Sequence, residues 1–519
     1  MKVIQTITRP RYIKKVTLGK SDISLNEIIA VARYKAEVFL SEEFRERILS
    51  SRKVIERFIN EERAIYGVTT GFGSNISESI SSKDTETLQQ NIIRSHAVSV
   101  GEPLEEEAVR AIQLMMLINL GQGFSGVRLE VLELLVSILN KGVVPFAPGE
   151  GSVGYLSPEA HMALVLTGEG KAWFQGELLQ GGEALKRAKL YPLTLSSKEG
   201  LALTSGTTSV TALAALALYN GIQAIKTADV AGAMSLEALK GTIKAFDPRN
   251  HRVKKHEEQA KTAANIVKIL HGSEIAEKYR EYRLQDALSL RCIPQVHGAI
   301  KKSFKDVKSS ILNEVNSSSD NPIILVEDEG TALMGGNFDG SYVGISADYM
   351  AIALANLAKI SERRIDRLLN HHVSELPSFL VTNPGLNSGY MILQYTAAGL
   401  LNEIRTLSHP ATIDNVPTCA NQEDLVSFAY FASKKAWQIS KKVEFILAIE
   451  ILAATQALEF HRPLKPSEAT GAVYKLVRSK VPAVTEDRYF FPDIQSLYEL
   501  LHEGEILDCV EMLIGEIEW

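Results

Sequence analysis

The chain has 519 residues, of which 45% are hydrophobic and 23% charged, enough for a large core and for two or three subdomains. Its formal net charge is −6 and no long basic run offsets it, so a nucleic-acid-binding surface is excluded. The sequence suggests no uncharged apolar run of about 18 residues, no signal peptide and no metal-ligand spacing among its cysteines, so we expect a cytoplasmic, reduced protein with no membrane span and no metal.

The first 206 residues predict an N-terminal domain that carries ligand-binding loops. Ser24 and Glu27 have the spacing of a capping box at the start of a helix. The glycine-rich segment 65–75 predicts a loop whose phenol, Tyr66, and backbone amides can surround a ligand, although the same pattern also fits a plain structural turn. Helices are expected over 84–145, where apolar residues recur at helical spacing.

The segment 151–166 predicts a tight loop that leads into a buried helix. Small residues come first, Pro158 stands where the helix would begin, and the apolar run 162–166 follows. After this helix, residues 178–182 predict an exposed strand and turn.

From about residue 207 the predicted elements are long apolar helices, over 210–224, 349–369, 389–407 and 424–458. Several exceed the usual length of a globular helix, which indicates long helices packed side by side in a second domain, 207–519. One predicted strand pair interrupts them, at 323–326 and 331–334, with a turn at 328–330. Such a bundle would expose apolar faces in a monomer, so we expect an oligomer.

A series of short motifs runs in order through the chain: Tyr66–Gly73, Ser95–Ala97, Phe124–Leu129, Gly200–Leu203, Ala245–Arg249, Gln285–Asp286, Ser289–Cys292, Ser319–Pro322, Gly335–Phe338, Ser361–Arg364 and Ala420–Asp424. Together with 151–161 they resemble the histidine/aromatic amino acid ammonia-lyase family over nearly the whole chain. The resemblance implies a mainly α fold, an ammonia-lyase-like (L-aspartase/fumarase-like) bundle of long helices with small β-hairpin excursions. It also implies a homotetramer whose active sites are built from several subunits.

The resemblance implies catalytic roles for four residues. Arg291 resembles the family's carboxylate clamp, since a guanidinium can donate two parallel hydrogen bonds, although an ion pair between subunits would also explain it. Tyr66 resembles the base that removes the β-proton, for which its pKa, ordinarily about 10, must be lowered. His96 and Glu423 resemble the pair that grips an imidazole ring, although either could instead be a buried core group.

Further positions are expected to line the substrate pocket. By resemblance these are Asn321, Gln285 and Phe338. Three more are positions where the chain departs from the family: Tyr155, Ser205 and Leu288.

The departures concern the family's prosthetic group. In the family an Ala-Ser-Gly triad cyclises into a methylidene-imidazolone group (MIO), but here Gly154 is followed directly by Tyr155. Tyr155 replaces an acidic residue that assists cyclisation, Ser205 an asparagine that contacts the group, and Leu288 a catalytic tyrosine. These changes predict a protein with no MIO and no other cofactor. A modified triad that the sequence does not display is the other explanation.

Without MIO, a free α-amine is a poor leaving group, which favours a substrate that carries a better one. The prediction is a carbon–nitrogen lyase that performs an MIO-independent 1,2-elimination of trimethylamine from a histidine betaine, ergothioneine or hercynine, to give a (thio)urocanate. Leu288 would offer the methyl groups an apolar wall, and Tyr155 or Phe338 a cation–π contact of roughly 0.5–2 kcal/mol. Two alternatives stay open: a histidine ammonia-lyase whose MIO triad the sequence conceals, and a non-catalytic relative that binds an imidazole acid.

Overall fold

The computed structural model describes residues 9–76, 80–81, 84–327 and 329–519, and within them the chain is mainly helical, as predicted. The start of the predicted N-terminal domain, residues 1–8, lies outside the described residues, as does Asp328 of the predicted turn at 328–330. The predicted boundary at 206/207 falls in the short turn between two helices, α8 (Glu199–Thr204) and α9 (Thr208–Ala238).

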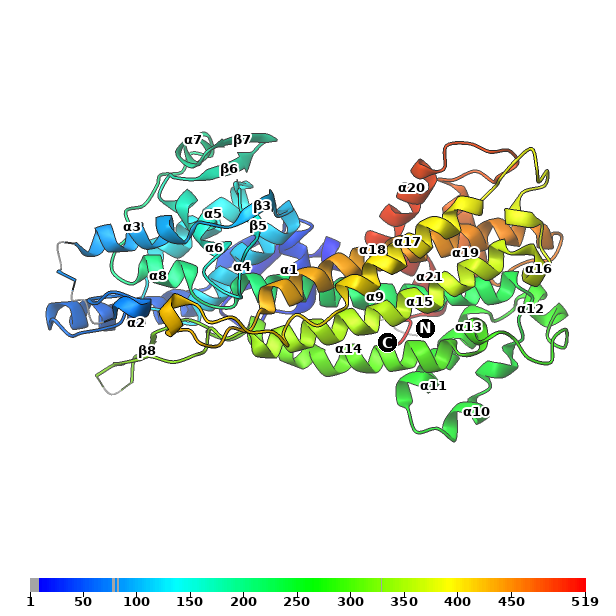
Figure 1. The fold of residues 1–519 in the computed structure, drawn as a ribbon, viewed down its shortest axis with the longest axis horizontal. Helices are drawn as coiled ribbons and strands as arrows, with labels where there is room; N and C mark the ends of the chain where they lie inside the picture. Colours follow the sequence, from blue (N-terminus) through cyan, green and yellow to red (C-terminus); the bar gives the residue numbers. More distant parts are fainter. Residues whose placement is uncertain (1–8, 77–79, 82–83, 328) are drawn as a thin grey trace.

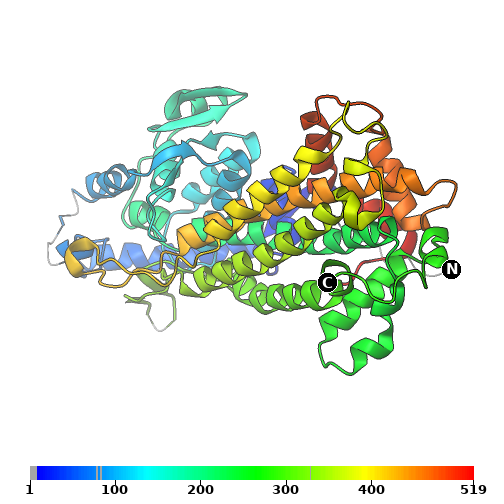
Figure 2. The same ribbon diagram turned by 45° about the vertical axis from the view of Figure 1, so that its right-hand side comes forward.

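Five long helices form the body of the molecule and run side by side along its long axis (Figures 1 and 2). They are α9 (Thr208–Ala238), α14 (Ile293–Val315), α15 (Ser341–Leu369), α17 (Met391–Leu407) and α18 (Ala429–Leu458). Helix α9 packs against α18, α14, α15 and the shorter helix α4 (Glu106–Gly121), and every residue in it except Gln223 is buried. A helix covered on all sides is apolar all round, which explains the composition of this segment.

Two helical stretches, Glu199–Ala238 and Ser341–Leu369, are long and apolar enough to cross a membrane by length and composition alone. The expectation that the sequence contains no such stretch was therefore wrong. The most apolar window of the first is 100% buried inside the protein and that of the second 67%. Their hydropathy follows from their place in the core of the bundle.

The N-terminal part surrounds one end of the bundle with shorter elements. Its helices are α1 (Leu25–Ala32), α2 (Glu42–Asn60), α3 (Thr85–His96), α4 (Glu106–Gly121), α5 (Leu129–Lys141), α6 (Glu159–Leu166), α7 (Gly181–Arg187) and α8 (Glu199–Thr204). The capping box at the start of α1 is confirmed, because the Ser24 and Glu27 side chains each bond the other's backbone.

The strands form small, separate pairings. They are β1 (Lys15–Leu18), β2 (Glu37–Leu40), β3 (Val100–Pro103), β4 (Val144–Pro145), β5 (Pro148–Glu150), β6 (Lys171–Phe174), β7 (Glu177–Gln180), β8 (Ile323–Leu325) and β9 (Thr331–Leu333). β1 pairs with β2 in parallel; β3–β5, β4–β6–β7 and β8–β9 are antiparallel. The predicted excursions after the 151–166 segment and around 323–334 are thus confirmed as hairpins.

The remaining helices gather at the other end of the bundle (Figures 1 and 2). They are α10 (Pro248–Arg252), α11 (Glu257–Ile269), α12 (Glu274–Lys278), α13 (Leu288–Arg291), α16 (His371–Ser374), α19 (Glu468–Arg478), α20 (Phe491–His502) and α21 (Glu505–Ile514). Thus α3, which ends at His96, and α13, which ends at Arg291, lie at opposite ends of the molecule.

Candidate active site

The loop predicted at 65–75 presents Tyr66 and requires glycine at two places. The amide of Gly73 donates a 2.8 Å hydrogen bond to the Tyr66 hydroxyl. Gly73 has φ +58°, and a Cβ added there would lie 2.7 Å from Cys419 Sγ; Gly67 has φ +63°, and its Cβ would lie 2.3 Å from Leu201 Cδ2. Only glycine fits both the backbone conformation and the space, so the loop is a close-packed support for the phenol.

Glu423 closes a strained turn that packs against this loop. The Thr418 amide donates to the Glu423 carbonyl at 2.8 Å, and the Thr418 hydroxyl donates to Glu423 Oε2 at 3.0 Å. Residues 419–421 have positive φ values of 53°, 54° and 65° although none is glycine. Such conformations cost about 1–3 kcal/mol each and persist where the surrounding structure imposes them, often at functional sites.

Tyr155 joins Glu423 from the segment 151–161. Its hydroxyl donates to Glu423 Oε2 at 3.1 Å, and its ring meets Phe338 edge to face with centroids 5.1 Å apart. Burial, reinforced by the Glu423 charge, raises the pKa of Tyr155 above its usual range. Tyr155 is therefore a neutral hydrogen-bond donor that helps to orient the carboxylate.

His96 and Tyr66 complete this group. His96 Nδ1 lies 2.8 Å from the Ile92 carbonyl, and its ring stacks at a tilt on Phe72, with centroids 5.4 Å apart. Because the carbonyl can only accept, Nδ1 carries the proton, and in the neutral ring Nε2 is left as an acceptor. Burial lowers the pKa of His96, against the opposing effects of the Ile92 carbonyl and Glu423.

Burial also raises the pKa of Tyr66. The Gly73 amide opposes this shift and Glu423 adds to it. The phenol is thus protonated near neutral pH in the single chain, and a neighbouring cation would be needed to make it a base.

Ser205 and Asn321 lie on two loops that touch each other beside this group. The Leu156 amide donates to the Thr204 carbonyl at 3.0 Å, and the Thr207 amide donates to Ser319 Oγ at 3.1 Å. The Asn321 side chain accepts from the Gly335 amide at 3.0 Å, which supports the turn that leads to Phe338. Ser205 and Asn321 lie near the group around Glu423 because residues next to them in the sequence make these contacts.

Arg291, Gln285 and Leu288 are not brought to this group within one chain. Leu288 and Arg291 belong to α13, and Gln285 precedes it by three residues, at the opposite end from α3 (Figure 1). Arg291 Nε is buried without a hydrogen-bond partner among the described residues, and Leu288 is 61% exposed. A second copy of the chain would have to supply this half of a combined site.

Sequence reasoning missed Cys419 at the site and Glu159 in the segment 151–161. Cys419 packs against Gly73, and only the tertiary structure reveals that contact. Glu159 is fully buried; its Oε1 accepts from the Thr208 hydroxyl and the Ser209 amide, both at 2.8 Å. Its Oε2 has no partner among the described residues, and burial raises its pKa. A lone acid opening an apolar helix was the available signal for Glu159.

The chain matches the model of the family "Aromatic amino acid lyase" over residues 23–479. It is 46% identical to a histidine ammonia-lyase of Caldanaerobacter subterraneus subsp. tengcongensis over 501 residues, 96% of this chain and 98% of that protein. The crystal structure of a histidine ammonia-lyase from Trypanosoma cruzi is similar at 38% identity and a TM-score of 0.90, covering 97% of this chain and 96% of that one. Ergothionase from Treponema denticola is similar at 27% identity and a TM-score of 0.87, covering 95% and 100%.

These comparisons contradict the predicted elimination of trimethylamine from a betaine. Relatives at 44–46% identity are named histidine ammonia-lyase, whereas ergothionase is a much more distant neighbour. The prediction gave the departures around MIO more weight than agreement along the rest of the chain. The histidine ammonia-lyase alternative is the better supported one.

The prediction of a protein without a cofactor is contradicted by the same relatives, because histidine ammonia-lyases carry MIO. The segment 151–161 of this chain nevertheless does not fit that group. Gly154 is followed directly by Tyr155, with no Ala-Ser-Gly between these two residues. The Tyr155 side chain is buried and its hydroxyl donates a hydrogen bond to Glu423.

Among the described residues no group of three or more His, Cys, Asp or Glu side chains is placed to hold a metal ion. The fold, the family match over most of the chain and the relatives at more than 40% identity agree with one another. The chain belongs to the aromatic amino acid lyase family of carbon–nitrogen lyases.

Proposed function

We propose that the protein releases ammonia from L-histidine by 1,2-elimination, which leaves a urocanate. The observation that carries this proposal is the group around Glu423, in which the Glu423 carboxylate and His96, whose Nε2 can accept a hydrogen bond, face the Tyr66 loop. Glu423 and His96 Nε2 both accept hydrogen bonds, so the pair matches the two N–H donors of a protonated imidazole ring. The names of the similar histidine ammonia-lyases support the same substrate.

Each residue has one task in this proposal. Glu423 and His96 hold the imidazole ring, and Arg291 binds the carboxylate of the substrate with its two terminal nitrogens. Tyr66 accepts the β-proton, and the electrons of that C–H bond form the double bond. The C–N bond breaks with its electron pair on nitrogen, so the α-ammonium group of the substrate leaves as neutral ammonia. Phe338, Asn321, Gln285, Leu288, Ser205 and Tyr155 line the pocket.

We further propose that each site is shared between copies in a homotetramer. Support comes from the separation of α13 from α3, and from Arg291 Nε, which has no hydrogen-bond partner in the described part of the chain. The α15 helix also leaves Tyr342 77% and Ile345 61% exposed, which is costly for a single chain in water. An Arg291 brought beside Tyr66 would lower the pKa of the phenol and so make it a better base.

The test is incubation of the purified protein with L-histidine, with ammonia and urocanate measured together. L-phenylalanine and L-tyrosine are the controls for the imidazole pair and should give no product. Intact mass of the same sample reports any internal cyclisation as a loss of water, independently of turnover. Binding of histidine without turnover would identify the non-catalytic alternative, and absence of binding would overturn the substrate assignment.

A further inference from the structure

We propose that the last five residues, 515–519, form a strap that positions Arg291 through a buried cluster of polar side chains. We call these residues the C-terminal strap. The inference rests on the role proposed above for Arg291, and it assigns a positioning function to Asn265, which lies far from the group around Glu423 in the sequence.

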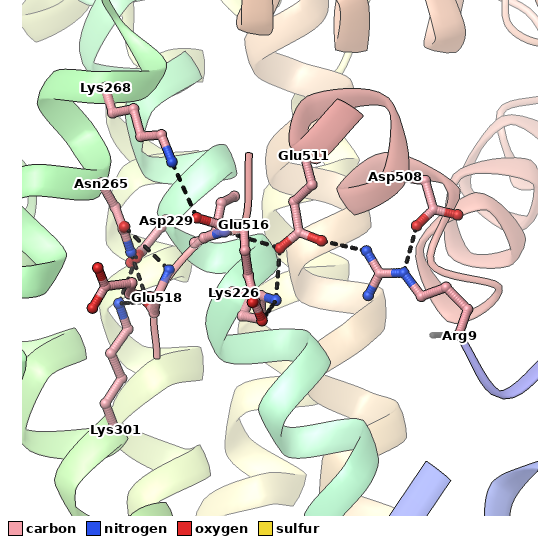
Figure 3. Close-up of polar contacts among 11 residues, drawn as sticks. Arg9, Lys226, Asp229, Asn265, Lys268, Lys301, Asp508, Glu511, Glu516 and Glu518 are labelled. Carbon is pink, nitrogen blue, oxygen red and sulfur yellow. Dashed lines mark hydrogen bonds and ion pairs between the residues drawn. The ribbon is translucent and has the colours of Figure 1, made fainter. Parts of the chain in front are cut away.

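The cluster is centred on Asp229 of α9 and ties that helix to α11 and α14 (Figure 3). Asp229 Oδ1 accepts from His297 Nδ1 at 2.8 Å, while Oδ2 accepts from Lys301 Nζ at 2.6 Å and Asn265 Nδ2 at 2.8 Å. Burial alone would raise the pKa of Asp229, but Lys301 and His297 outweigh it and hold the pKa below its usual range. The ionised carboxylate therefore bonds two side chains of α14 and one of α11.

The strap closes the cluster from outside. The Glu518 carbonyl accepts from Asn265 Nδ2 at 2.7 Å and from Lys301 Nζ at 3.0 Å, and the Glu518 amide donates to Asn265 Oδ1 at 3.3 Å. Further along the strap, Lys268 donates to the Glu516 carbonyl at 3.1 Å, at an exposed position (Figure 3). Asn265 is thus bonded both to the strap and to Asp229, whereas the Lys268 side chain bonds the strap and is not among the described partners of Asp229.

The cluster holds the start of α14, the helix that directly follows Arg291. Helix α13 ends at Arg291 and continues almost without a break into α14, since the Cys292 amide donates to the Leu288 carbonyl and the Val296 amide to the Cys292 carbonyl. His297, which bonds Asp229, lies in the second turn of α14.

The position of α14 against α9 therefore sets the position of Arg291. Gly232 of α9 allows close approach there, because a Cβ added to it would lie 3.0 Å from Ile293 Cδ1. A displacement of about 1 Å in a substrate-holding group can lower kcat/KM by about a hundredfold, so a modest loosening of this junction is expected to be measurable.

The decisive variant is N265A, with K268A as its matched control on the same helix and the same strap. Asn265 is neutral, so its removal leaves no charge without a partner. We expect N265A to raise the KM for L-histidine at least about threefold with kcat within about twofold, because a carboxylate contact serves ground and transition states alike. It should also speed hydrogen exchange at the amides of 292–296, and K268A should do neither.

Hydrogen exchange is measured without substrate, so it tests the strap even if histidine is not turned over; histidine affinity by calorimetry then replaces KM. Unchanged exchange in N265A overturns the strap, whatever the activity. Faster exchange with unchanged KM or affinity overturns the positioning role and leaves a purely structural one. If N265A does not fold, N265S, which keeps a shorter hydrogen-bonding group, is expected to give intermediate shifts in both readouts, and wild-type values in both would contradict the proposal.

Discussion

At the scale of single residues, Glu423 organises the candidate site, because its charge acts on Tyr66, His96 and Tyr155 together. One of its oxygens accepts hydrogen bonds from both the Tyr155 and the Thr418 hydroxyls. A carboxylate held in this way keeps one direction free for a ligand, which suits it to receive the N–H of an imidazole ring.

The Y66F variant tests the base. Loss of the phenol should lower kcat by about 10²–10⁴-fold with little change in KM, because binding does not depend on the hydroxyl. Burial raises the pKa of Tyr66, so the phenolate fraction and kcat of the native enzyme should increase with pH above neutrality. The comparison variant Y155F removes a hydroxyl that orients Glu423 but does not remove a base, so it should lower kcat far less than Y66F does. Native kcat in Y66F would exclude Tyr66 as the base.

Glu159 gives a pH-dependent stability prediction. Burial raises its pKa in the folded state above the unfolded value, so the folded protein binds more protons and loses stability as pH rises above the unfolded pKa of about 4.3. E159Q cannot ionise, and its stability relative to the native chain should therefore be greater at pH 8 than at pH 4.5. Urea denaturation at both pH values measures this, with E46Q on the exposed side of α2 as the control. A pH-independent difference would contradict the prediction.

At the scale of elements, the site consists of loops held by helices rather than of helix faces. The Tyr66 loop and the turn at 418–423 meet through Gly73 and Cys419, and neither is a regular helix or strand. The Tyr66 loop has glycine where φ is positive, at Gly67 and Gly73. The turn at 418–423 has positive φ at residues 419–421 without glycine, so the surrounding structure must hold these residues in a strained conformation.

The G73A variant tests that dependence. Alanine would be strained at φ +58° and would meet Cys419 Sγ, so the Tyr66 loop must move. We expect kcat to fall at least tenfold while thermal unfolding, followed by circular dichroism, shifts only slightly, because the bundle does not depend on this loop. G142A is the matched control: it has φ +70° at the end of α5 but open space around it, so it carries the backbone cost of about 1 kcal/mol alone. Equal activity in both variants would remove the Cys419 contact from the explanation.

At the scale of the whole molecule, the long bundle keeps the two halves of the predicted site apart. The group around Glu423 lies at the end that carries α3, and Arg291 lies at the other end (Figure 1). Antiparallel association of copies along the exposed apolar face of α15 would bring such ends together.

Mixing of inactive variants tests this arrangement. Y66F and R291M should each be nearly inactive, but their hetero-oligomers should regain activity in about one quarter of sites, where an intact Tyr66 from one copy meets an intact Arg291 from another. Co-expression with two different affinity tags isolates the mixed species, and mixing of each variant with itself is the control. Absence of any recovery would mean that each site is formed within a single chain.

Much of the fold followed from local pattern. The capping box at Ser24, the hairpin at 323–334 and the long helices after residue 207 were predicted because each depends on residues close in sequence. The substrate was mispredicted, since the departures at Tyr155, Ser205 and Leu288 describe one part of the site and not the chain's overall relatedness. The roles of individual site residues remain predictions.

The sequence by itself determined that this protein is a bundle of long helices with the motifs of the aromatic amino acid lyases, because helical periodicity and short motifs are local properties. The tertiary structure alone decided which side chains meet. Tyr155 bonds Glu423 across 268 positions, Asp229 collects His297, Lys301 and Asn265 from two other helices, and Arg291 is carried away from Tyr66. These contacts depend on how the helices pack, and packing is set by the whole buried core rather than by any segment within it.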